Sequence, residues 1–211
     1  MIKYITEVDY YVKKLLFQQF LNNIFNFYAN FAIIIIVQYN GGFIMIERFY
    51  PDMMVDSVEQ IDLDMLKEKG IKGLILDIDN TLVPSFIKEA DERTLKWIDL
   101  VKKKGFNACI LSNARKKRVQ QFNEKLGLKA IYRASKPGRR AFAKALDVLC
   151  LDASQTAVIG DQIFTDVYGG NRLGMYTILV KPIHKEEFFF VKLKRYPEKY
   201  ILKRYYNDVK N

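Results

Sequence analysis

Two aspartates one residue apart, Asp77 and Asp79, follow the short apolar run of residues 74–76 in the stretch DIDNTLV. Carboxylates at the end of a buried strand are costly unless a cation neutralises them. A turn stabilised by an aspartate side chain would also explain a lone pair of this kind. The cation interpretation gains weight because Asp161 and Asp166 follow another apolar run. Carboxylates at two strand ends form a hard-oxygen site suited to Mg²⁺.

The chain around these aspartates alternates between two patterns. Short apolar runs bounded by polar turns predict strands buried on both faces. These runs are residues 74–76, 106–111, 156–159 and 176–180. Helical periodicity, with apolar residues on one face, lies between them in residues 91–104, before Gly127 and after Pro137. The alternation predicts an α/β fold built on a doubly wound parallel sheet.

The active site of such a sheet lies beyond the carboxyl ends of its strands. Asp77, Ser112 and Asp161 follow three of the predicted strands, so we expect them to converge. The same alternation also suits a plain nucleotide-binding domain. However, no Gly-rich phosphate loop precedes a helix, which argues against a P-loop kinase or a Rossmann dehydrogenase.

Composition limits the possible function classes. The 211 residues suit one globular domain with some residues left over, and the 50% apolar content supplies a core without disulfides. Cys109 and Cys150 are the only cysteines, which suits a reducing cytoplasm. One histidine, His184, excludes His-rich zinc sites. The formal net charge of +10 favours acidic partners, namely nucleic acid, anionic lipid or phosphorylated metabolites.

Residues 1–44 differ from the rest of the chain. No charged residue occurs from 15 to 46, and the longest uninterrupted apolar piece is far shorter than the ~20 residues of a membrane span. We expect a non-native or disordered extension, such as translated intergenic DNA, with the true start at Met45. The codons of Gly41-Gly42 can contain a bacterial ribosome-binding sequence at a suitable distance from that start. A poorly formed membrane anchor is the alternative.

Four segments occur in order with helix-sized spacings: DIDNTLV, ILSNA, the pair Lys136-Pro137, and GDQIFTD. They resemble the four motifs of the haloacid dehalogenase (HAD) superfamily, and the resemblance covers roughly residues 45–182. The start MIERFYPD and the phrase IKGLILDIDNTLV are similar to the YqeG-type branch of the subclass IIIA phosphatases. That branch is related to phosphatidylglycerophosphate phosphatases.

The resemblance implies a magnesium-dependent phosphatase with a HAD-like Rossmannoid domain over residues 45–183. Asp77 would attack phosphorus and form an aspartyl-phosphate. Asp79 would act as general acid and then as general base, with its backbone carbonyl in the metal shell. Mg²⁺ would bridge Asp77, Asp79 and Asp161, with Asp166 steadying the site.

The resemblance also implies a phosphate-binding set. Ser112 and the backbone N–H of Asn113 would bind the phosphoryl oxygens, and Lys136 would offset the charge of nucleophile and phosphate. Each residue has a plainer alternative. Ser112 or Asp166 would cap a helix, and Lys136 would be surface charge.

HAD proteins often carry a cap domain, for which this chain has no room. Residues 83–108 hold one loop and one helix, and residues 113–136 hold one helix and one short strand. An open site implies a bulky substrate, such as a lipid headgroup at a membrane or a macromolecule, because water must be excluded by something other than a cap.

Basic residues near the motifs agree with a large anionic substrate. They are Arg115, Lys116, Lys117, Arg118, Arg139 and Arg140. The tail, residues 184–211, mixes aromatic and basic residues, as attachment to anionic lipid requires. Packing of the tail on the core is the alternative, and the mixture also suits single-stranded nucleic acid. Pro197 predicts that the tail is not one long helix.

The function expected from these observations is dephosphorylation of phosphatidylglycerophosphate to phosphatidylglycerol, in the cytoplasm with peripheral contact at the inner membrane face. A soluble sugar-phosphate or nucleotide phosphatase is the first alternative. A non-catalytic binding or scaffold protein on the same fold is the second, although the intact motifs argue against it. Nucleic acid is not the expected partner.

Overall fold

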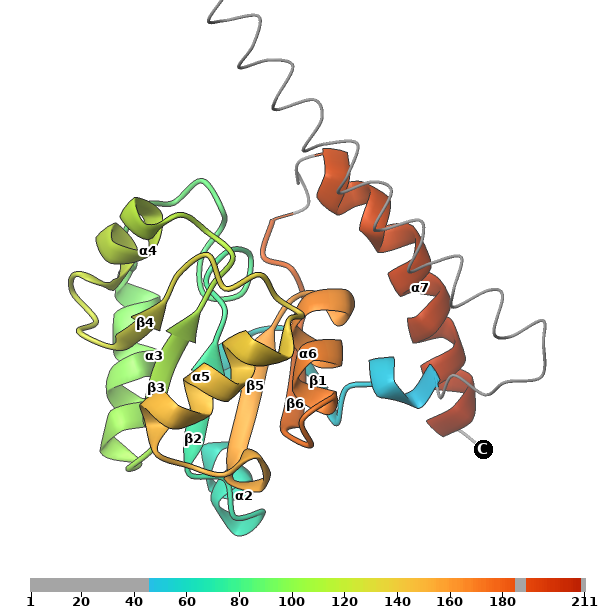
Figure 1. Cartoon of the computed structure of the whole chain (residues 1–211), viewed down its shortest axis with the longest axis horizontal. Helices are drawn as coiled ribbons and strands as arrows, with labels where there is room; N and C mark the ends of the chain where they lie inside the picture. The colour runs from blue at the N-terminus through green and yellow to red at the C-terminus, as the bar shows by residue number, and fades with distance from the viewer. Residues whose placement is uncertain (1–45, 185–188, 210–211) are drawn as a thin grey trace, which may run out of the picture. The chain divides into compact units, whose positions relative to one another are not determined.

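The computed structural model of the chain describes residues 46–184 and 189–209 (Figure 1). The expectations for residues 1–44 lie outside this part of the chain. The strands are β1 (Met53–Val55), β2 (Gly73–Leu76), β3 (Asn107–Leu111), β4 (Lys129–Ile131), β5 (Thr156–Gly160) and β6 (Tyr176–Val180). The α-helices are α2 (Leu63–Glu68), α3 (Glu92–Lys103), α4 (Lys116–Asn123), α5 (Arg139–Leu149), α6 (Tyr168–Asn171) and α7 (Phe189–Val209). Short helical turns are η1 (Ile46–Phe49), η2 (Val58–Gln60), η3 (Ala153–Gln155) and the π-helical η4 (Ile163–Val167).

The strands form one six-stranded parallel sheet in the order β1-β6-β5-β2-β3-β4. From β2 the chain winds outward through β3 and β4, then crosses back to β5 and winds outward through β6. This topology confirms the predicted doubly wound α/β fold. Strand β1 was not predicted, because its three half-buried residues give no periodic signal in the sequence.

Helices cover both faces of the sheet, and the central strand β2 shows how. Leu74 and Leu76 point into a core beneath α2, α3 and α4, whereas Ile75 points into a second core beneath α5. This alternation follows from the two-residue period of a strand. Since both faces are filled with apolar side chains, polar chemistry is confined to the ends of the strands.

The segments where a cap would be inserted are short. Only the loop of residues 77–91 joins β2 to α3, and only α4, β4, α5 and η3 lie between β3 and β5. All of these residues belong to the described part of the chain. The expected absence of a cap domain is therefore confirmed for both insertion points.

The expectation for Pro197 was wrong, because α7 runs unbroken from Phe189 to Val209. A proline inside a helix removes one backbone hydrogen bond. Contacts made by the following turn offset that loss: Glu198 and Ile201 are buried, and Glu198 Oε1 accepts a hydrogen bond from the Ile163 N–H at 3.0 Å. In the described residues, no helix is both long enough and apolar enough to cross a bilayer.

Candidate active site

Three neighbouring strands place polar residues at one edge of the sheet. Strand β2 pairs with β3 on one side and β5 on the other, and Leu76 lies in register with Ile110 and Ile159. Parallel strands in this register end side by side, so the residues that follow them meet. Asp77 comes directly after β2, Ser112 after β3 and Asp161 after β5.

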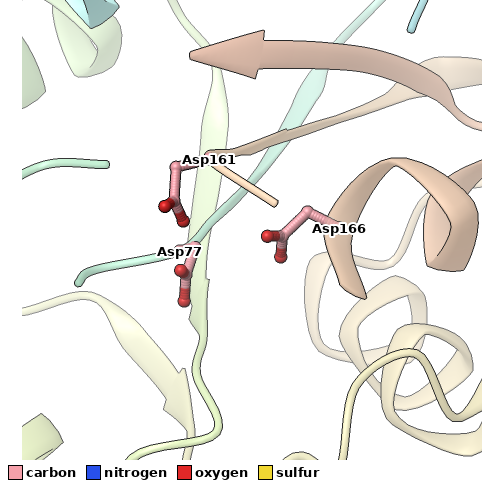
Figure 2. Close-up of side chains that lie close together, drawn as sticks. All are labelled: Asp77, Asp161 and Asp166. Atoms are coloured by element: carbon pink, nitrogen blue, oxygen red, sulfur yellow. The ribbon is translucent and has the colours of Figure 1, made fainter. Parts of the chain in front are cut away.

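Three carboxylates come together at this edge (Figure 2). Asp77, Asp161 and Asp166 each offer an oxygen within 4.8 Å of the others, and all three residues are buried. Burial of several like charges is unfavourable unless cations compensate them. Oxygen donors at this spacing fit a hard divalent cation such as Mg²⁺, so the residues present suit the metal that the sequence predicted.

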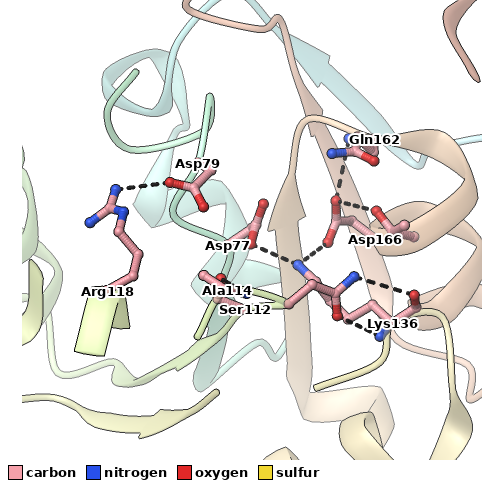
Figure 3. Close-up of polar contacts among 10 residues, drawn as sticks. Asp77, Asp79, Ser112, Ala114, Arg118, Lys136, Gln162 and Asp166 are labelled. Carbon is pink, nitrogen blue, oxygen red and sulfur yellow. Dashed lines mark hydrogen bonds and ion pairs between the residues drawn. The ribbon is translucent and has the colours of Figure 1, made fainter. Parts of the chain in front are cut away.

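Lys136 is the cation at the centre of the cluster (Figure 3). Its Nζ lies 2.8 Å from Asp77 Oδ1 and 2.6 Å from Asp166 Oδ1. The residue is 8% exposed, so the alternative that it is surface charge is wrong. Lys136 thus contacts two of the three carboxylates, and a divalent cation would add positive charge to the same cluster.

Burial determines the acidity of this cluster. Burial raises the pKa of Asp77 from 3.8 to about 7, against the opposing effect of the Lys136 charge, and the nearby Asp166 raises it further. Burial alone would lower the pKa of Lys136, but the charges of Asp166 and Asp77 raise it above its ordinary value. Lys136 therefore stays positively charged, whereas Asp77 needs a further cation to be fully ionised at neutral pH.

Asp166 is held by η4 instead of capping a following helix. Its Oδ2 accepts hydrogen bonds from the Gln162 N–H at 3.3 Å and from Thr165 Oγ1 at 3.0 Å. Gly160 lies against the same carboxylate, since a Cβ built there would be 2.3 Å from Asp166 Cγ. Only glycine leaves room for Asp166 at the end of β5.

Ser112 and Asn113 have local contacts that the sequence did not reveal. Ser112 Oγ accepts a hydrogen bond from the Ala114 N–H at 3.1 Å, and Arg115 is the N-cap of α4, so Ser112 is not the helix cap. The side chain of Asn113 holds the backbone of Lys136. Its Oδ1 accepts from the Lys136 N–H at 2.7 Å, and its Nδ2 donates to the Lys136 carbonyl at 3.4 Å.

The Asp79 carboxylate lies outside the group of three. Its Oδ1 is 2.8 Å from Nη2 of Arg118, and about a third of the side chain is exposed. The structure thus brings Asp77, Asp161, Asp166 and Lys136 together and leaves Asp79 beside them at the edge of the site. A ligand role for Asp79 through its backbone carbonyl stays a prediction.

Arg118 was predicted only as part of a basic run. Its guanidinium lies 5.4 Å from the centre of the Phe122 ring, on the same side of α4. Residues four apart share a face of a helix, and Phe122 is buried in the core. Helical spacing therefore contained the signal that Arg118 points inward while Lys116 and Lys117 point to solvent.

Together these residues supply the parts of a hydrolytic site for an anionic group. A buried carboxylate, Asp77, is available as nucleophile, and a second carboxylate two positions later is available for proton transfer. A fixed ammonium, that of Lys136, lies between Asp77 and Asp166. Such a site can attract an anion to Asp77 only when the negative charge of the cluster is compensated.

Comparisons with known proteins find relatives of this chain. The HAD-hydrolase-like family matches residues 133–182. The probable phosphatase YqeG of Bacillus subtilis is 40% identical over 159 residues, which cover 75% of this chain and 92% of that protein. Phosphatidylglycerophosphate phosphatase 1, chloroplastic/mitochondrial, of Arabidopsis thaliana is 29% identical over 166 residues, which cover 74% of this chain and 47% of that protein. The cobalt-bound deoxy-D-mannose-octulosonate 8-phosphate phosphatase of Haemophilus influenzae is 18% identical, with a TM-score of 0.43 over 55% of this chain and 81% of that chain.

Proposed function

Because the chain belongs to the YqeG-type family of HAD-like phosphatases, we propose that it hydrolyses phosphomonoesters with Mg²⁺ through an aspartyl-phosphate on Asp77. The observation that carries this proposal is the buried group of Asp77, Asp161 and Asp166 with Lys136 between two of its members. A structural core position would not retain three buried carboxylates so close together. A site that binds both a cation and a phosphoryl group would retain them.

The proposed reaction has two steps. An Asp77 carboxylate oxygen bonds to phosphorus while the bond to the leaving oxygen breaks, and Asp79 gives that oxygen a proton. Water then attacks phosphorus, Asp79 takes up a proton from it, and the bond between Asp77 and phosphorus breaks. The products are an alcohol and inorganic phosphate, and both carboxyl groups return to their starting state.

The other residues stabilise charge during both steps. Lys136 lies on Asp77 and so offsets the charge that nucleophile and phosphoryl group share. The hydroxyl of Ser112 and the N–H of Asn113 follow β3 at the same edge and are the proposed donors to the phosphoryl oxygens. When bound by Asp161, Asp166 and Asp77, with the Asp79 carbonyl, Mg²⁺ supplies positive charge that keeps Asp77 ionised and draws the phosphate to it.

For the substrate we propose a phosphomonoester on an anionic lipid headgroup, as in phosphatidylglycerophosphate. Six exposed cations follow β3 and β4 at the edge of the sheet that carries the site, and we call them the basic rim. They are Arg115, Lys116, Lys117, Arg133, Arg139 and Arg140. None of the six forms an ion pair with another residue that the structure describes. Unpaired cations around an uncapped site suit a phosphate displayed on a negatively charged surface.

The Arabidopsis relative is named as a phosphatidylglycerophosphate phosphatase, which supports the same substrate, although this chain spans about half the length of that plant enzyme. Exposed Phe86, in the loop that follows β2, adds an apolar side chain at 61% exposure. Basic and aromatic side chains together favour attachment at a lipid–water interface. We therefore place the proposed reaction in the cytoplasm, at the inner face of the membrane.

The test is phosphate release from phosphatidylglycerophosphate in mixed micelles, beside a panel of soluble sugar phosphates and nucleotides. We expect Mg²⁺-dependent turnover that prefers the lipid and is lost in Asp77→Asn, whose fold is checked by circular dichroism. A preference for the soluble esters would overturn the lipid substrate while leaving the phosphatase. Full activity in Asp77→Asn would overturn the mechanism.

A further inference from the structure

Arg118 links three separate parts of the site (Figure 3). Its Nη2 donates to Asp79 Oδ1 at 2.8 Å, and its Nη1 donates to the backbone carbonyl of Lys88 at 3.1 Å. The guanidinium also lies over the Phe122 ring. It therefore connects the turn after β2, the loop that precedes α3, and helix α4.

These contacts fix the orientation of the guanidinium. The Arg118 side chain is 17% exposed, so water competes little for its hydrogen bonds. A planar group held by two donor contacts and one aromatic face has little freedom to rotate. The partner carboxylate of Asp79, itself a third exposed, is held by the same geometry.

The chemistry of arginine suits this position. Guanidinium has no acceptor and does not lose its proton in proteins, so Arg118 cannot take the proton that Asp79 is proposed to transfer. The contact engages Oδ1 of Asp79, while Oδ2 has no hydrogen bond within the part of the chain that the structure describes. The second oxygen is the one available to a leaving group.

We propose that Arg118 is a positioning residue for proton transfer, which holds the Asp79 carboxylate so that its second oxygen faces the leaving oxygen of the substrate. The inference rests on the proposed role of Asp79 as general acid. A proton donor is effective only within hydrogen-bond reach of its acceptor, and a fixed donor avoids the entropy of finding that position. The hydrogen bond from Arg118 to the Lys88 carbonyl also fixes the guanidinium relative to the loop beside the site.

Leaving-group dependence separates this role from a structural one. An alkyl phosphate needs a proton on its leaving oxygen, whereas p-nitrophenyl phosphate releases a stable anion. We expect Arg118→Met to lower kcat for phosphatidylglycerophosphate or glycerol phosphate by ~10- to 100-fold. The same variant should change kcat for p-nitrophenyl phosphate less than about threefold. Arg118→Lys should recover part of the loss, since an ammonium still reaches Asp79 but lacks the two-pronged contact.

A matched control exists in the same region. Lys125 Nζ pairs with Glu89 Oε2 at 2.9 Å and so joins the same loop to the segment after α4 without touching Asp79. Lys125→Met removes an ion pair of the same loop that is more exposed than that of Arg118. We expect it to leave kcat for both esters unchanged. Melting temperatures of both variants should stay within a few degrees of the parent.

A double-mutant cycle with Asp79→Asn completes the test. If Arg118 acts through Asp79, Arg118→Met causes no further loss of kcat in the Asp79→Asn background. Equal losses on both esters, or an additional loss in that background, would overturn the inference and leave the proposed function standing. If Asp79→Asn itself shows no dependence on the leaving group, the role of Asp79 in the proposed function fails, and the inference fails with it.

Discussion

The side chain of Asn113 clamps the main chain of Lys136 from both sides. The Lys136 N–H donates to Asn113 Oδ1 at 2.7 Å, while Asn113 Nδ2 donates to the Lys136 carbonyl at 3.4 Å. The ammonium of the same lysine then reaches Asp77 and Asp166. A residue whose backbone follows β3 thus positions a charge that comes from the loop after β4.

Replacing Asn113 with alanine should misplace the Lys136 ammonium without unfolding the protein. Loss of two hydrogen bonds at a partly exposed position costs about 1 kcal/mol each. Displacement of a catalytic charge costs more in rate, and we expect kcat to fall by ~10-fold or more. Steady-state kinetics and thermal melts measure the two effects separately. An unchanged kcat would show that the clamp does not determine the position of Lys136.

Replacing Lys136 with methionine should strongly destabilise the metal-free protein. The change leaves Asp77 and Asp166 buried without their cation, and breaking a buried pair costs ~3–5 kcal/mol. Urea unfolding with a chelator present measures this. The exposed pair of Lys125 and Glu89 gives the comparison, since water screens it and removing it should lower stability far less. If the two variants lose equal stability, the buried cluster is not ionised in the metal-free protein.

The pH dependence of stability should have opposite signs with and without Mg²⁺. In the metal-free fold, burial raises the pKa of Asp77 from 3.8 to about 7 in spite of the Lys136 charge. The folded state then binds a proton more tightly than the unfolded chain, so this contribution is greatest at acid pH and is lost as the pH rises through 7. With Mg²⁺ present, affinity depends on ionised Asp77, so stabilisation grows as the pH rises.

Melting curves at several pH values, with chelator and with Mg²⁺, measure both trends. The Asp77→Asn variant is the control, because an amide does not titrate there. We expect its metal-free melting temperature to vary less with pH between about 4 and 7 than that of the parent. Parallel curves for the two proteins would mean that Asp77 does not titrate in this range.

Replacing Gly160 with alanine should weaken Mg²⁺ binding. A Cβ at this position would lie 2.3 Å from Asp166 Cγ, so the carboxylate has to move. The Mg²⁺ concentration for half-maximal activity should rise by about tenfold or more, since misplaced ligands bind poorly. Gly73→Ala is the control at the opposite end of a strand. Its Cβ meets the flexible end of Leu151 at 2.5 Å, so it should lower stability and leave Mg²⁺ dependence unchanged.

Most of the fold could be predicted because the patterns that indicate its strands and helices lie within short stretches of sequence. Apolar runs and helical spacing predicted four strands and the helices between them, and polar residues after the runs predicted which side chains meet. Strand β1 could not be predicted in this way. Its three residues are ordered by pairing with β6, where Met53 lies opposite Ile178, and such a partner is more than a hundred residues distant. Pairing of that kind depends on tertiary contacts that a local pattern does not contain.

The residues of the site also divide into those predicted from the local sequence and those that depend on tertiary contacts. Residue type and strand position predicted Asp77 and Asp161, whereas Lys136 was expected only from the resemblance to the HAD motifs. The hydrogen bonds from the Asn113 side chain to the Lys136 backbone were not predicted, and neither was the inward direction of Arg118. Both depend on neighbours that are distant in the sequence. For Pro197, an intrinsic helix-breaking preference was overridden by the buried turn that contains Glu198 and Ile201.

The hydrogen bond between Glu198 and Ile163 joins the carboxyl-terminal helix to the turn η4, which carries Asp166. Ile163 begins the turn η4 that carries Asp166, and its N–H donates to a carboxylate that is 3% exposed. A buried donor that loses its partner raises the free energy of its own segment. Detachment of α7 should therefore destabilise the turn that holds Asp166 at the acidic cluster.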